Sequence, residues 1–168
     1  MDIIRQRKAI RLKDYDYSQT GCYYITICTK NRACLFGDIH NGNMLLNEYG
    51  EIARDELEKV SAHYNNVKID KFVIMPNHVH LIVAINPIEQ TGALPIKAVD
   101  IPNIIGKYKA GVTRTVGNAF MRSGIWQSRY YDHIIRNEKS YSEIYKYIEN
   151  NPLKWDMDCH NPIKPTSA

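Results

Sequence analysis

The chain has 168 residues, a net charge of +4 and a hydrophobic fraction of 44%, which is enough for one domain with a buried core. No apolar run is long enough to span a membrane, and the first residues lack the apolar segment of a signal peptide. We therefore predict a soluble, cytoplasmic protein with a single domain over residues 1–168, flanked by a basic arm (1–14) and a tail (157–168).

The arm is the most basic part of the chain. Its first thirteen residues contain five cations and one acid, and the cations are Arg5, Arg7, Lys8, Arg11 and Lys13. Such a cluster can neutralise DNA phosphates, although a solvated arm without a partner explains it equally well. The chain also has 12 tyrosines, a residue type that stacks on bases.

The first half of the chain predicts strands around one helix. Residues 22–29 are rich in β-branched and aromatic side chains and predict a strand that buries the thiols of Cys22 and Cys28. Residues 35–46 contain Asn41-Gly42-Asn43 between apolar pieces, which indicates a hairpin. Apolar residues then recur at three- and four-residue steps, so residues 48–63 predict an amphipathic helix capped by Asn47.

The second half of the chain predicts further strands and helices. Residues 67–75 and 78–85 predict two strands joined by a tight turn at Pro76-Asn77, and residues 86–100 predict a loop. Residues 101–119 predict a second amphipathic helix with Lys107 and Arg114 on its polar side. Residues 126–135 predict a further strand.

The last helix has a capping signal. Ser140-Tyr141-Ser142-Glu143 matches the capping box, so we predict that the helix begins at Ser140 and ends before Pro152. The order of elements predicts an α+β fold. It is a ferredoxin-like antiparallel sheet, as in RNA-recognition domains, with helices on one face and an added C-terminal helix.

Two histidines are candidate metal ligands. Side chains alternate between the faces of a strand, so His78 and His80 point to the same side, while Val79 points to the other. Two imidazoles in this arrangement can converge on one cation. Surface or hydrogen-bonded histidines remain the alternative for this short pattern.

A tyrosine on the last helix is a candidate nucleophile. The apolar stripe of this helix contains Tyr141, Ile144 and Ile148, whereas Tyr147 lies off its centre. Asn151 is one turn further on and on the same side as Tyr147. A half-exposed tyrosine beside a capping asparagine is the alternative reading.

Taken together, these signals resemble a known family. A His-hydrophobic-His strand followed by a helix with Tyr and a polar residue four positions later is similar to the HUH endonucleases. The chain resembles in particular the single-tyrosine transposases of small bacterial insertion sequences and the REP-associated tyrosine transposases. The resemblance covers most of residues 15–156, and its matching segments are residues 75–80, 126–136 and 147–154.

The resemblance implies a function and a set of site residues. It implies Tyr147 as nucleophile, His78 and His80 as metal ligands, and Asn151 as a third ligand where related enzymes have glutamine. The expected cofactor is Mg²⁺ or Mn²⁺, and the expected reaction cleaves and rejoins single-stranded or hairpin DNA through a 5′-phosphotyrosine. The matching segment also implies DNA contacts for Tyr131, His133 and Arg136, and either a packing or a DNA-binding role for Trp126. The positive charges of the arm, Lys107 and Arg114 make them further expected contacts with the DNA backbone, independently of the resemblance.

Three alternatives remain open at this point. The same strand order occurs in RNA-binding modules, which stack bases on aromatic residues of the sheet. The chain could also be a domesticated DNA-binding protein that no longer cleaves, or hold an isolated zinc site. The family resemblance leaves open both a monomer and a homodimer that shares active sites.

Overall fold

A computed structural model describes residues 12–88 and 99–162 of the chain. Its strands are β1 (Gly21–Cys28), β2 (Gly37–His40), β3 (Asn43–Leu46), β4 (Val67–Met75), β5 (His78–Ile85) and β6 (Tyr131–Ile135). Its helices are α1 (Glu48–His63), α2 (Ile101–Phe120) and α3 (Glu138–Glu149), with short 3₁₀ helices η1 (Lys30–Arg32) and η2 (Pro152–Met157). None of the helices in these residues is long and apolar enough to cross a membrane.

Four strands form an antiparallel sheet in the order β4-β5-β1-β6, which confirms the predicted fold class. β5 lies inside the sheet, between β4 and β1, and every one of its residues is buried. β2 and β3 form a separate hairpin, as predicted. Its turn residues Asn41 and Gly42 both have positive φ, which the tight two-residue turn requires.

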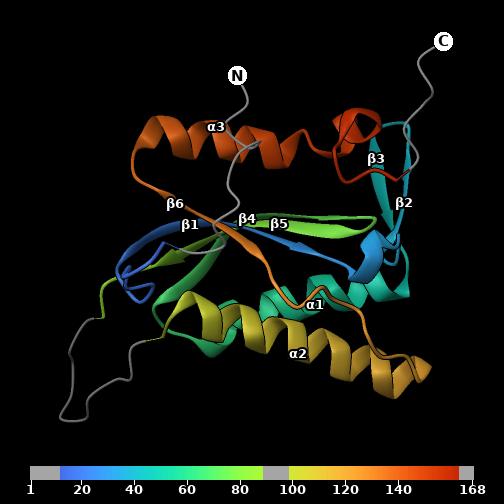
Figure 1. The fold of residues 1–168 in the computed structure, drawn as a ribbon, viewed down its shortest axis with the longest axis horizontal. Coiled ribbons are helices and arrows are strands. Elements are labelled where there is room, and N and C mark those ends of the chain that lie inside the picture. Colours follow the sequence, from blue (N-terminus) through green and yellow to red (C-terminus); the bar gives the residue numbers. More distant parts are fainter. Residues whose placement is uncertain (1–11, 89–98, 163–168) are drawn as a thin grey trace.

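Helices cover both faces of the large sheet (Figure 1). α1 and α2 lie on one face, and the main core forms there around Val79, Leu81 and Val83 of β5. α3 lies on the opposite face, where Ile144 and Ile148 pack with residues of β1 and β5 in a smaller cluster. The added C-terminal helix therefore covers the face of the sheet that carries His78 and His80.

Two predicted boundaries are wrong. α3 begins at Glu138 rather than Ser140, because the side chain of Asn137 accepts a hydrogen bond from the Ser140 amide at 2.8 Å and caps the helix one turn earlier. β6 begins at Tyr131 rather than at residue 126. Trp126 makes only an isolated bridge to Thr29, and its indole Nε1 donates to the Lys109 carbonyl at 3.2 Å. Its ring packs on Phe36, so Trp126 contributes to the core.

Candidate active site

The two predicted histidine ligands lie side by side on β5. Strand alternation turns both imidazoles toward α3, and their ring centroids are 4.5 Å apart. Both side chains are essentially inaccessible to solvent, with exposures of 0% for His78 and 1% for His80. Burial of two polar rings is unfavourable unless their nitrogens have partners, so the partners of each nitrogen are informative.

His78 is oriented by its neighbour Asn77. The Nδ1 atom of His78 lies 2.9 Å from Asn77 Oδ1, and an amide oxygen can only accept, so Nδ1 carries the proton. The Asn77 amide is itself fixed, because its Nδ2 donates to the carbonyls of Arg32 at 3.0 Å and His160 at 2.7 Å. In the neutral ring the other nitrogen, His78 Nε2, is therefore unprotonated and carries a lone pair.

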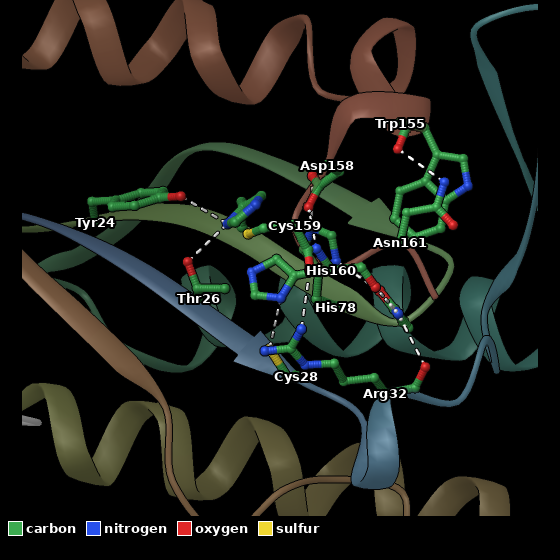
Figure 2. A network of polar contacts seen from close by, with 12 residues as sticks. Tyr24, Thr26, Cys28, Arg32, His78, Trp155, Asp158, Cys159, His160 and Asn161 are labelled. Atoms are coloured by element: carbon green, nitrogen blue, oxygen red, sulfur yellow. Dashed lines mark hydrogen bonds and ion pairs between the residues drawn. The ribbon is translucent and has the colours of Figure 1, made fainter. Parts of the chain in front are cut away.

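His80 is held from β1. Its Nδ1 lies 2.8 Å from both the Tyr24 hydroxyl and Thr26 Oγ1, and in Figure 2 the hydroxyls of Tyr24 and Thr26 point to the same place. Thr26 is the antiparallel pairing partner of His80, so the sheet register itself sets this contact. Nε2 of His80, like Nε2 of His78, is buried and has no hydrogen-bond partner in the part of the chain that the structure describes.

Burial keeps both imidazoles neutral. Desolvation, followed by the charge of His160, lowers the pKa of His80 to about 3. Desolvation also lowers the pKa of His78 well below its ordinary range, and the charges of His80 and His160 add to this effect. Neutral rings with orienting partners on one nitrogen and a free second nitrogen are the state in which histidine binds metals.

The predicted tyrosine meets these histidines. α3 brings Tyr147 over the sheet, with its ring centroid 5.3 Å from that of His80 and 6.4 Å from that of Tyr24. Burial, followed by the charge of Asp158, raises the pKa of Tyr147 to about 12, and the nearby Asn151 amide partly opposes this increase. Tyr147 is therefore a protonated phenol in the metal-free protein at neutral pH.

Asn151 lies in the same cluster. Its side chain is buried, with 2% exposure, and its Oδ1 has no hydrogen-bond partner among the described residues. The amide is also close enough to His78 to raise the pKa of that imidazole slightly. The structure thus brings the side chains of His78, His80, Tyr147 and Asn151 into one buried cluster.

A further acid lies at this site and was not predicted from the sequence. Asp158 is buried, and its Oδ2 lies 3.9 Å from His78 Nε2. Candidate ligand atoms of His78, His80 and Asp158 all lie within 4.8 Å of one another. The residue falls in the predicted tail (157–168), and the only signal there was the run Asp158-Cys159-His160, three residues of metal-binding types in sequence.

These donors fit a divalent ion. Two neutral imidazole nitrogens, a carboxylate oxygen and an amide oxygen converge in a buried space. Three of these four residues have a buried atom with no hydrogen-bond partner within residues 12–88 and 99–162. Leaving three such atoms unpaired would be costly, and binding of a cation would satisfy them together. The group His78, His80 and Asp158, with Asn151 beside it, could therefore hold a metal.

Comparison with known proteins identifies the family. The family model described as "Transposase IS200 like" matches residues 18–151, which include all of the sheet and α3. The chain belongs to the IS200-like transposase family.

Relatives and a solved structure agree with this assignment. An uncharacterized protein of Haemophilus influenzae is 43% identical over 169 residues, covering 92% of this chain and 93% of the relative. The REP-associated tyrosine transposase of Escherichia coli is 27% identical over 138 residues, covering 82% and 70%. A solved REP-associated tyrosine transposase bound to a REP hairpin superposes with a TM-score of 0.60 at 25% identity, covering 85% of this chain and 74% of that one.

The predicted DNA contacts of this IS200-like transposase lie in three places. Tyr131 and His133 of β6 pair with Thr26 and Tyr24 of β1, so they share the sheet face of the histidines, and Arg136 is exposed just after β6. Lys107 and Arg114 lie on α2, on the opposite face of the sheet, and the structure does not bring them to the histidines. Four predicted contacts of the arm lie outside the described residues: Arg5, Arg7, Lys8 and Arg11.

Proposed function

We propose that this transposase cleaves and rejoins single-stranded DNA by metal-assisted transesterification, with Tyr147 as the nucleophile. The observation that carries the proposal is the position of this phenol, whose ring centroid lies 5.3 Å from that of His80. It belongs to the cluster in which two imidazole Nε2 atoms have no hydrogen-bond partner among the residues that the structure covers. Packing alone does not require a phenol, two neutral imidazoles and an amide oxygen to meet in one buried place.

His78, His80 and Asn151 would hold the metal, and Asp158 would add a carboxylate. Nitrogen donors together with hard oxygens suit Mn²⁺ and also accept Mg²⁺. When bound, the ion would supply positive charge that polarises the scissile phosphate and offsets the negative charge that develops on it.

Tyr147 would perform the covalent step. Its Oη forms a bond to phosphorus, and the bond between phosphorus and the 3′ oxygen breaks. The proton that the phenol loses is balanced by the proton that the leaving 3′ oxygen gains. The product is a 5′-phosphotyrosine and a free 3′-hydroxyl, and the reverse reaction rejoins DNA without ATP because the ester energy is kept in the protein–DNA bond.

The supporting residues would position these groups. Asn77 fixes the tautomer of His78, and Tyr24 and Thr26 fix the orientation of His80. Both histidines are buried, so a phosphate can reach them only when the side chains that cover them move, and the ring of His160, with its centroid 4.6 Å from that of His78, is one of these covers. We infer that the flexible backbone of single-stranded DNA approaches the histidines past Tyr131 and His133, on the same face of the sheet.

Hairpin DNA is the substrate that we infer, since the superposable transposase is bound to a REP hairpin. Electrostatic contacts would come from Arg136 and the basic arm, and binding through phosphates would weaken as salt increases. The site is assembled from the residues of one chain, which supports a monomer that cleaves in cis rather than a dimer that exchanges its tyrosines.

The test uses a labelled single-stranded REP-like hairpin with Mn²⁺. We expect a covalent protein–DNA adduct with the wild-type protein and with Tyr145→Phe, and no adduct with Tyr147→Phe. Tyr145 is the matched control because it is on the same helix, where its ring lies under the Lys71 ammonium at 4.4 Å. Binding without any adduct from the wild-type protein would instead favour a domesticated DNA-binding module.

A further inference from the structure

Donors of a different chemical kind lie next to the histidine pair. Cys28 ends β1 and is half-buried, while Cys159 and His160 belong to the turn that follows η2. Figure 2 shows Cys28 and His160 facing each other across the gap between the strand and the turn. The proposed DNA cleavage uses neither thiol.

The distance between two of these donors is close to that in a thiolate metal site. Cys28 Sγ lies 3.9 Å from His160 Nδ1, which is longer than a strong hydrogen bond. A tetrahedral Zn²⁺ with bonds of about 2.3 Å to sulfur and about 2.0 Å to nitrogen keeps those two ligands about 3.5 Å apart. A small shift of either side chain would therefore bring both atoms to ligand positions.

The turn presents two further donors beside His160. Candidate ligand atoms of Asp158, Cys159 and His160 lie within 4.8 Å of one another. The backbone of the turn is fixed, because Arg32 Nη1 donates to the Cys159 carbonyl at 3.0 Å and Asn77 Nδ2 donates to the His160 carbonyl at 2.7 Å. Asp158 Oδ1 accepts from the His160 amide at 2.7 Å, which holds the turn closed. A preorganised turn lowers the entropic cost of ligand convergence.

We propose that Cys28, Cys159 and His160 form a second metal site that binds Zn²⁺ or another thiophilic divalent ion, with water as its fourth ligand and Asp158 left to the histidine pair. Thiolate and imidazole ligands select zinc over Mg²⁺ and Mn²⁺, which prefer oxygen. Each thiol loses its proton to solvent when the ion binds. The ion would join the end of β1 to the turn that covers the histidine pair. This inference does not depend on Tyr147 or on cleavage.

Spectroscopy with Co²⁺ as the probe tests the site directly. Thiolate ligation of Co²⁺ gives a charge-transfer absorption in the near ultraviolet, whereas ligation by histidine, asparagine and aspartate gives none. We expect this band in the full-length protein, its loss on addition of Zn²⁺, and roughly half of its intensity in Cys28→Ser and in Cys159→Ser. Cys34→Ser is the matched control and should keep the full band, as should the double variant His78→Ala/His80→Ala.

Absence of the band from the wild-type protein would overturn the proposal, and so would a band of full intensity in Cys28→Ser. Alkylation provides a test without mutation, because Cys34 and Cys159 are both exposed. Zn²⁺ should slow alkylation of Cys159, measured by mass spectrometry of its peptide, by tenfold or more, on the order expected for a ligating thiolate. Cys34 should react at the same rate with and without Zn²⁺, and an unchanged rate at Cys159 would contradict the site.

Discussion

Because the histidine pair is buried, we predict that the metal affinity of the site changes little with pH. An ordinary imidazole has a pKa near 6.5, so at pH 5.5 about nine-tenths of it is protonated and cannot bind a metal. Protonation of two such ligands would together weaken metal binding by about 100-fold when the pH falls from 7.5 to 5.5. An exposed histidine pair on a strand would show this loss.

The buried pair should behave differently. With a pKa of about 3, His80 is still almost entirely neutral at pH 5.5, and His78 is depressed in the same direction for the same reason. Protons therefore do not compete for either Nε2 atom in this range. We expect the Mn²⁺ dissociation constant of the DNA-free protein to change by less than about twofold between pH 7.5 and pH 5.5.

The assay is electron paramagnetic resonance of free Mn²⁺ during titration of the full-length protein at both pH values. The variant His78→Ala identifies the signal that belongs to this site, because it should remove the strong binding. A loss of about 100-fold in the wild-type protein would refute the reasoning, since it would mean that the imidazoles are exposed to solvent when the metal is absent. Strong binding that persists in His78→Ala would place the metal elsewhere.

Three other predictions follow from the same contacts. Asn77→Ala should weaken Mn²⁺ binding by about 10- to 100-fold in the same titration, because the tautomer of His78 is no longer fixed; an unchanged affinity would refute that role. With a chelator present, the free energy of unfolding measured in urea should fall by about 1.4 kcal/mol per pH unit per histidine as the pH drops below 6.5. The reason is that the histidines of the unfolded chain bind protons in this range, whereas buried His78 and His80 in the folded protein do not. That slope should become shallower in His80→Gln. Because the pKa of Tyr147 is raised to about 12, adduct formation should accelerate from pH 7 to pH 9 by up to about tenfold per unit, and a flat profile would contradict attack by the phenolate.

The fold and the core of the site were predictable because they depend on short periodic patterns. Strand alternation alone places His78 and His80 on one face, and the buried register of β5 confirms it. The helical step predicted that Tyr147 and Asn151 would share one side of the last helix, although α3 ends at Glu149 and Asn151 follows it directly before η2. The family resemblance, and not the periodicity, indicated that this helix would cover the histidine face.

The features that the sequence did not predict depend on contacts between distant segments. Asn137 caps α3 in place of Ser140, since several polar residues near a helix start can serve and tertiary packing selects among them. Asp158 belongs to a turn without periodicity, and it reaches His78 only because η2 reverses the chain after Pro152. The orienting role of Asn77 likewise depends on carbonyls 45 and 83 residues away in sequence.

Peptide mapping of the protein–DNA adduct tests the central claim most directly. Trypsin cleaves after Lys146 and Lys154, so Tyr147 lies alone among tyrosines in the peptide 147–154, whereas Tyr141 and Tyr145 lie in the peptide 140–146. After incubation with hairpin DNA and Mn²⁺, followed by nuclease and trypsin, we predict a nucleotide phosphate on the peptide 147–154. A nucleotide on the peptide 140–146, or on any other tyrosine, would contradict the assignment of Tyr147 as the nucleophile.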